Sequence, residues 1–141
     1  MADQIPRAEP ESFRARALSA SITVADLEKS AAWYCDAIGF TVGLRYEREG
    51  KLLAVRLVAG DVELLLTQDD GAKGKERAKG EGISLMITTA QSVDAVAARI
   101  KASGGTLDAE PTDMPWGARA FRFRDPDGFK LTISSERPAG R

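Results

Sequence analysis

The chain has 141 residues, enough for one domain with a hydrophobic core or for two very small units that share one. Its 20 basic and 21 acidic residues leave a net charge of −1, so neither nucleic acid nor a membrane is expected as a partner. The chain contains no histidine, which removes the usual general base near neutral pH and the commonest metal ligand.

The first half of the chain alternates between strand and helix patterns. Residues 17–24 have a strand pattern, and Asp26 is a good N-cap for a helix over residues 27–38, which Gly39 ends. Strands are predicted to begin at Phe40, Lys51 and Val62. Residues 69–82 are rich in Gly, Lys and Glu, which predicts a solvated linker.

The same order of elements returns after this linker. A strand over residues 83–89 precedes a helix over 92–103 and a strand over 106–111. The stretch "DMPWGARAFRFRDPDGFKLTI", residues 113–133, then predicts a hairpin with its turn at the DPDG sequence. We therefore predict one α+β domain over residues 17–135 with two β-α-β-β-β modules, at 17–68 and 83–135, flanked by ends at 1–16 and 136–141.

Three of the predicted strands alternate between apolar side chains on one face and small or polar side chains on the other. The apolar faces are where helices would pack. The opposite faces are predicted to line a cleft, or else to be the wet side of an antiparallel sheet. Their side chains are Ser19, Ser21 and Thr23 on the first strand, Ser84, Met86 and Thr88 on the fifth, and Lys130, Thr132 and Ser134 on the eighth.

The duplicated order and two sequence stretches resemble the vicinal oxygen chelate superfamily, the group of glyoxalases, bleomycin resistance proteins and extradiol dioxygenases. "ITVADLEKSAAWYCDAIGF" is similar to the opening strand and helix of that family. "PWGARAFRFRDPDGFKLTI" is similar to its closing hairpin, most closely that of bleomycin-resistance-like members. The resemblance covers residues 18–134 and implies two βαβββ modules that form a cupped mixed sheet with a cleft.

The enzymes of that family hold a divalent metal with residues on the first and last strands of each module. The resemblance places Ser19, Glu63, Ser84 and Thr132 at those positions. Unactivated hydroxyls are weak neutral ligands for a transition metal, so we expect the chelate site to be lost. No cofactor is expected, and a divalent metal is possible but disfavoured.

The resemblance also implies a ligand-lining role for the hairpin. Trp116 would stand at the mouth of the cavity, although a tryptophan in a Pro-Trp-Gly turn is as often a loop anchor. Arg119, Phe121 and Tyr46 are predicted to add a cationic and aromatic lining suited to a flat, partly anionic or polar ligand. With Ser21 and Met86 from the polar faces, these residues complete the expected ligand-binding set.

Two classes of function are compatible with these features. The first is a protein that binds or sequesters a planar or polar compound in a cleft completed by a homodimer. The second is a glyoxalase-like lyase or isomerase with a weak or absent divalent metal and Glu63 as the base. A third interpretation is an interaction module without a ligand. The single cysteine, which excludes an internal disulfide, and the lack of a long apolar run predict a cytoplasmic protein.

Overall fold

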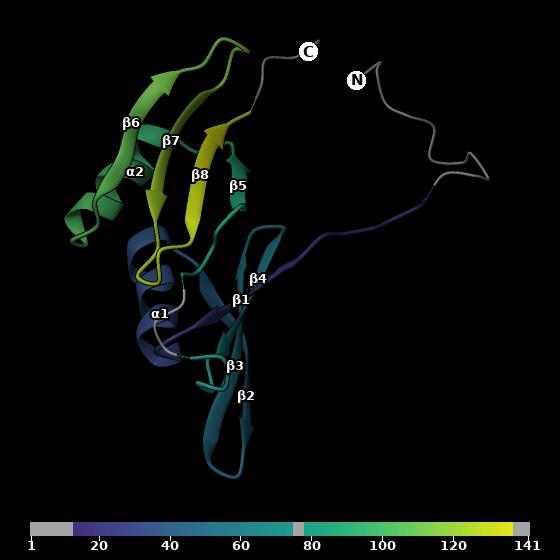
Figure 1. Cartoon of the computed structure of the whole chain (residues 1–141). Coiled ribbons are helices and arrows are strands. Elements are labelled where there is room, and N and C mark those ends of the chain that lie inside the picture. The colour runs from purple at the N-terminus through teal and green to yellow at the C-terminus, as the bar shows by residue number, and fades with distance from the viewer. Residues whose placement is uncertain (1–12, 75–77, 137–141) are drawn as a thin grey trace.

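The computed structural model describes residues 13–74 and 78–136, and these contain the predicted βαβββ order twice (Figure 1). No helix in this part of the chain is long and apolar enough to cross a membrane. The first module consists of β1 (Ala20–Val24), α1 (Leu27–Trp33), the π-helical turn η1 (Tyr34–Ile38), β2 (Thr41–Arg48), β3 (Lys51–Ala59) and β4 (Val62–Gln68). The second consists of β5 (Ser84–Thr89), α2 (Val93–Ala102), β6 (Leu107–Asp113), β7 (Arg119–Arg124) and β8 (Lys130–Ser135).

Each module forms its own four-stranded mixed sheet. Sheet A has the order β1-β4-β3-β2 and sheet B the order β5-β8-β7-β6. In each sheet the first strand of the module pairs in parallel with the last, and the remaining pairs are antiparallel. This arrangement confirms the α+β fold class that the duplicated pattern predicts.

The predicted first helix differs from the structure in its second half. Asp26 caps α1 as expected, because its carboxylate accepts a hydrogen bond from the Lys29 N–H at 3.2 Å. The chain then widens into the π-turn η1, which ends at Gly39 with a φ of 107°. This widened turn carries Tyr34, whose side chain is fully buried.

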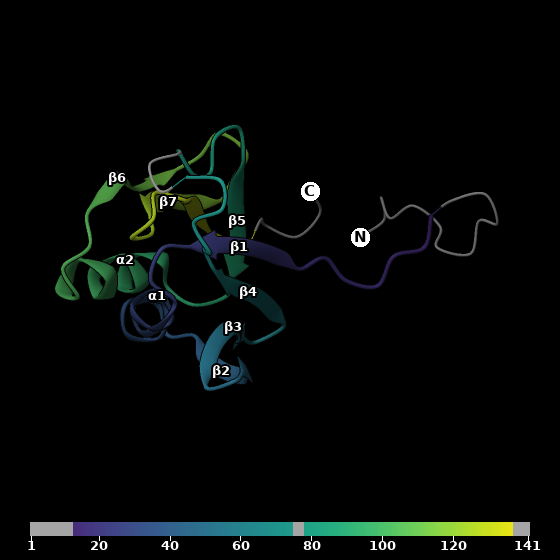
Figure 2. The same ribbon diagram turned by 60° about the horizontal axis from the view of Figure 1, so that its bottom comes forward.

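The two helices lie side by side between the two sheets (Figure 2). Two hydrogen bonds join α2 to the turn η1 that continues α1, because Arg99 on α2 donates to the carbonyls of Asp36 and Cys35 at 3.1 and 3.4 Å. Each sheet therefore has one covered face, packed on helices in a common core, and one open face that points away from the helices. The core includes Val55, Leu57 and Leu66 from sheet A and Phe121, Phe123 and Ile133 from sheet B.

The turn between β7 and β8 docks onto the first module through two carboxylates. Asp125 accepts a 2.7 Å hydrogen bond from the Tyr34 hydroxyl across 91 positions of sequence. Asp127 accepts hydrogen bonds from the Ala25 N–H at 2.8 Å and from the Ser30 hydroxyl at 3.2 Å. The DPDG turn therefore joins the modules as well as reversing the chain.

One lysine of the predicted linker is part of the same polar cluster. Lys79 is only 10% exposed in its side chain and forms ion pairs with Asp69 at 2.9 Å and Asp127 at 3.6 Å. The expectation that residues 69–82 are uniformly solvated is wrong at this position, because two carboxylates draw the ammonium group to the junction of the modules. Trp33 adds an apolar contact between the modules, with its ring centroid 6.0 Å from that of Phe123.

Removing the Tyr34 hydroxyl tests this docking contact. Tyr34→Phe should lower the free energy of unfolding by about 1.5–3 kcal/mol, because a largely buried carboxylate loses a donor. Asp125→Asn is the matched variant. It should cost less, because its amide oxygen can still accept the hydrogen bonds that Asp127 and Phe129 N–H groups donate at 2.9 Å. Urea unfolding at pH 7 measures both, and a Tyr34→Phe protein as stable as the wild type would contradict the prediction.

The same contact predicts a loss of stability in alkali. Burial, followed by the charge of Asp125, raises the pKa of the Tyr34 phenol in the folded protein. The protonated Tyr34 therefore stabilises the folded protein fully below the pKa of an unfolded tyrosine, about 10. Above that pH the free energy of unfolding falls by up to about 1.4 kcal/mol per pH unit. Tyr34→Phe should remove this part of the slope between pH 9.5 and 11, and identical slopes in both proteins would refute it.

Candidate functional site

A groove lies where the first strands of the two modules come together. It has a volume of about 420 Å³ and brings together Ser19, Glu63, Ser84 and Met86, four of the predicted site residues. All four are exposed, so their polar or thioether groups are accessible from solvent. Leu18 and Ile83 contribute exposed apolar surface to the same groove.

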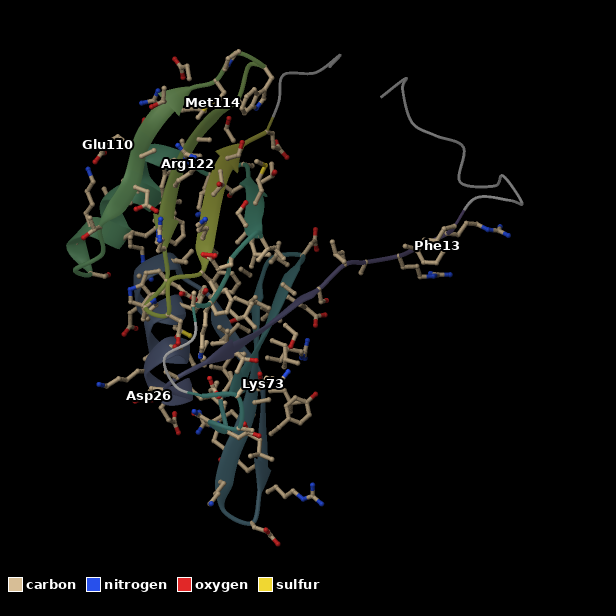
Figure 3. The ribbon with its side chains drawn as sticks, viewed as in Figure 1. Phe13, Asp26, Lys73, Glu110, Met114 and Arg122 are labelled. Carbon is tan, nitrogen blue, oxygen red and sulfur yellow. The ribbon has the colours of Figure 1, made fainter. Side chains whose placement is uncertain are left out.

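A second hollow of about 570 Å³ adjoins the groove at Met86 and contains Trp116. The tryptophan follows Met114, which Figure 3 places at the turn between β6 and β7. Its side chain is 47% exposed, and Thr88 and Ser134 lie in the same hollow. Trp116 therefore presents an accessible aromatic surface in the same hollow as Met86.

A third hollow of about 400 Å³ adjoins the groove at Ser84 and crosses the open face of sheet B. Thr132, one of the predicted site residues, lies in it. The other polar side chains in this hollow are Asp108, Arg122, Arg124 and Lys130. The strand register places Met86, Thr132 and Arg122 in one row across β5, β8 and β7.

Ser21 and Tyr46 lie on the open face of sheet A. Ser21 pairs with Leu65 in the register, and Tyr46 pairs with Ala54. Tyr46 is 48% exposed, and Leu44 on the same strand is 44% exposed. This face therefore presents large apolar side chains with no helix over them.

Phe121 and Arg119 are not on the open face, which corrects their predicted place in the lining. Phe121 is fully buried in the core, with its ring 5.6 Å from that of Phe123. Arg119 reaches toward α2, where its guanidinium pairs with Asp94 at 3.2 Å, and toward Asp113 at 3.0 Å. Both belong to the face of β7 that the helices cover, because two bulky phenylalanines on that face are worth more buried than exposed.

Arg122 lines the third hollow and is absent from the site residues that the sequence predicts. It alternates with Phe121 and Phe123, so the same period of two that buries the phenylalanines places Arg122 on the open face. Figure 3 shows it over the middle of sheet B. The signal was present in the sequence, but the face carrying the aromatic residues was assigned to the ligand instead of to the core.

The candidate metal positions do not form a cage. Three of the four side chains are hydroxyls, and the remaining one, Glu63, already pairs with Arg56 at 3.5 Å. Among residues 13–74 and 78–136, no three Cys, Asp or Glu side chains are grouped in a way that could hold a metal ion. These donors do not fit a transition metal, since such sites use imidazole, thiolate or several carboxylates.

The described residues combine two βαβββ modules with adjoining hollows along the open faces of the sheets. Residues 16–133 match the family model described as the Glyoxalase/Bleomycin resistance protein/Dioxygenase superfamily. The chain belongs to this superfamily, in agreement with the resemblance of its two sequence stretches.

Similar proteins have been described in several bacteria. A probable lactoylglutathione lyase from Synechocystis sp. is 25% identical over 122 residues, which are 82% of this chain and 92% of that protein. TnmS3, an antibiotic binding protein from Streptomyces sp., superposes with a TM-score of 0.69 at 24% identity, covering 88% of this chain and 98% of that one. A glyoxylase/bleomycin resistance protein/dioxygenase domain from Frankia sp. gives 0.71 at 21% identity, covering 90% and 95%. The solved structures share the fold with this chain.

Proposed function

We propose that this protein binds a planar, partly polar small molecule on its open sheet faces, without a transition metal. The observation that carries the proposal is the run of adjoining hollows along β5, in which exposed Met86 and Trp116 stand among hydroxyl side chains. Apolar surface with a few convergent polar groups is the usual lining of a small-molecule site. The similarity to TnmS3, an antibiotic binding protein, supports the same kind of ligand.

Binding is favoured over catalysis by the side chains that face the groove. Ser19, Ser84 and Thr132 can donate and accept hydrogen bonds, but among residues 13–74 and 78–136 none of these hydroxyls is hydrogen-bonded to a basic side chain that would activate it as a nucleophile. These residues can orient a ligand. They supply no evident path for moving protons.

The proposed binding unit is a homodimer. The open faces of sheets A and B point away from each other in one chain, because both helices lie between the sheets (Figure 2). One chain therefore cannot close a cavity between its own open faces, whereas a second copy can place its open face opposite. Exposed Leu44, Tyr46 and Met86 are apolar surface that such a contact would bury.

The alternative function is a glyoxalase-like lyase or isomerase with Glu63 as its base. The 25% identity to a probable lactoylglutathione lyase favours it. Glu63 faces the groove and is the one carboxylate among its predicted site residues, although its pairing with Arg56 means that a substrate would have to compete for it.

Trp116 provides the test of ligand binding. In a Trp33→Phe background Trp116 is the sole indole, and titration with a panel of planar aromatic compounds should change its emission saturably for at least one class. Trp116→Ala should weaken the binding of that class by roughly tenfold, since stacking and burial of an indole are worth more than 1 kcal/mol. The melting temperature should change little, because the side chain is half exposed. A variant that unfolds while the affinity of its folded fraction is unchanged would show that Trp116 is a loop anchor.

Metal content and Glu63 separate binding from catalysis. Protein purified without chelator should contain well under one zinc, nickel, iron or manganese per chain, because the available donors are mainly hydroxyls. Elemental analysis measures this directly. Glu63→Gln should leave the affinity of the compound found with Trp116 unchanged within about twofold, and metal-dependent lyase activity that disappears in Glu63→Gln would favour the alternative.

The oligomeric state is measured by sedimentation velocity. The wild type should sediment as a dimer at micromolar concentration, and Leu44→Lys should shift it toward the monomer by placing a charge in the apolar contact. Lys51→Ala, an exposed substitution at the end of the same hairpin, is the control and should remain dimeric. A wild-type monomer at high micromolar concentration would contradict the proposed unit.

A further inference from the structure

Three cationic side chains gather on the open face of sheet B. Arg122 and Arg124 are two positions apart on β7 and therefore share a face. Lys130 pairs with Arg124 in the register between β7 and β8. We call Arg122, Arg124 and Lys130 the cationic face, and all three line the hollow that also contains Ser84 and Thr132.

In the described part of the chain, a single carboxylate forms an ion pair with one of these three cationic side chains. Asp108 accepts a hydrogen bond from Arg124 at 2.9 Å. Arg122 and Lys130 form no ion pair or hydrogen bond with a side chain among residues 13–74 and 78–136. By contrast, Arg56 on the open face of sheet A reaches Glu63 at 3.5 Å.

This local excess of positive charge is not a consequence of composition. The whole chain has a net charge of −1, so enough carboxylates exist to pair every cation. Like charges on neighbouring strands repel each other and lower stability. An anion that binds between the positive charges offsets this repulsion.

We propose that the cationic face binds the anionic group, a carboxylate or phosphate monoester, of an amphipathic ligand whose aromatic body lies toward Met86 and Trp116. The inference rests on the proposed function and names its class of ligand. An arginine suits this role because its planar guanidinium donates two parallel hydrogen bonds to a carboxylate or a phosphate.

The strand register places the anionic and aromatic parts of such a ligand at the correct spacing. Thr132 lies between Met86 and Arg122 in one row, so its hydroxyl can donate to an anion held by Arg122. Ser134 and Ala120 form the next row, roughly 7 Å away along the strands, and Ser134 shares the hollow of Trp116. A fused bicyclic ring with one anionic substituent is long enough to span about one such spacing between neighbouring rows.

Three probe compounds of matched shape test this inference: 2-naphthoate, 2-naphthyl phosphate and the neutral 2-naphthamide. Calorimetric titration of the full chain at low ionic strength should show that at least one anion binds about tenfold more tightly than the amide. Arg122→Gln should remove this difference. Arg48→Gln, which deletes the same charge at an exposed position near the end of β2, should retain it. Raising the salt concentration should weaken binding of the anions and leave the amide unchanged.

The outcomes separate this inference from the proposed function. If the amide binds as tightly as both anions and also changes the Trp116 emission, the anionic class is wrong while planar-ligand binding stands. If Arg122→Gln shifts the monomer-dimer equilibrium but leaves anion affinity unchanged, the cationic face serves a second copy of the chain, and the inference is overturned. If none of the three probes binds, the inference fails, while the wider Trp116 panel still tests the proposed function. Equal melting temperatures for the two variants control for unfolding.

Discussion

The geometry of the candidate site depends on how the β7–β8 turn is held against the first module. Burial raises the pKa of the Asp125 carboxyl, and the hydrogen bond from Tyr34 acts in the opposite direction, toward the charged form. Asp127 anchors the same turn to the start of α1. Because this turn connects β7 to β8, its docking sets where sheet B lies relative to β1 and β4. The groove between Ser19 and Ser84 exists only in that relative position.

A second constraint is that each sheet has helices on one face alone. Residues 13–74 and 78–136 contain two α-helices for two sheets, and both helices contribute to the shared core. Neighbouring residues on one strand therefore differ in burial. Phe121 is buried in the core, and the next residue, Arg122, is exposed on the open face. The open faces need not be apolar for the fold to be stable, so their residues are free to specialise in binding.

Much of this arrangement follows from the sequence, because strand period and capping residues are local signals. Ser19, Glu63, Ser84 and Met86 were predicted to share a site, and the structure brings them into one groove. Which face of β7 packs against the helices was not predictable in the same way. Its alternation separates Phe121 from Arg122, but which set meets the helices depends on the packing of α2, a contact between distant segments. The burial of Lys79 cannot be predicted from the sequence for the same reason, because its ion-pair partners, Asp69 and Asp127, lie 10 and 48 positions away along the chain.

The two open faces have diverged in chemistry although the modules repeat each other. The open face of sheet A carries exposed Leu44 and Tyr46, and its arginine, Arg56, is neutralised by Glu63. The open face of sheet B carries the cationic face, with one carboxylate for three positive charges in the part of the chain described here. In the proposed dimer, where the open face of one chain lies opposite that of the other, the cleft would have one apolar wall and one basic wall. A ligand with an aromatic body and a single anionic group can contact the apolar wall and pair with the basic wall at the same time. A neutral apolar compound leaves the charges of Arg122 and Lys130 without a counterion in a partly desolvated site.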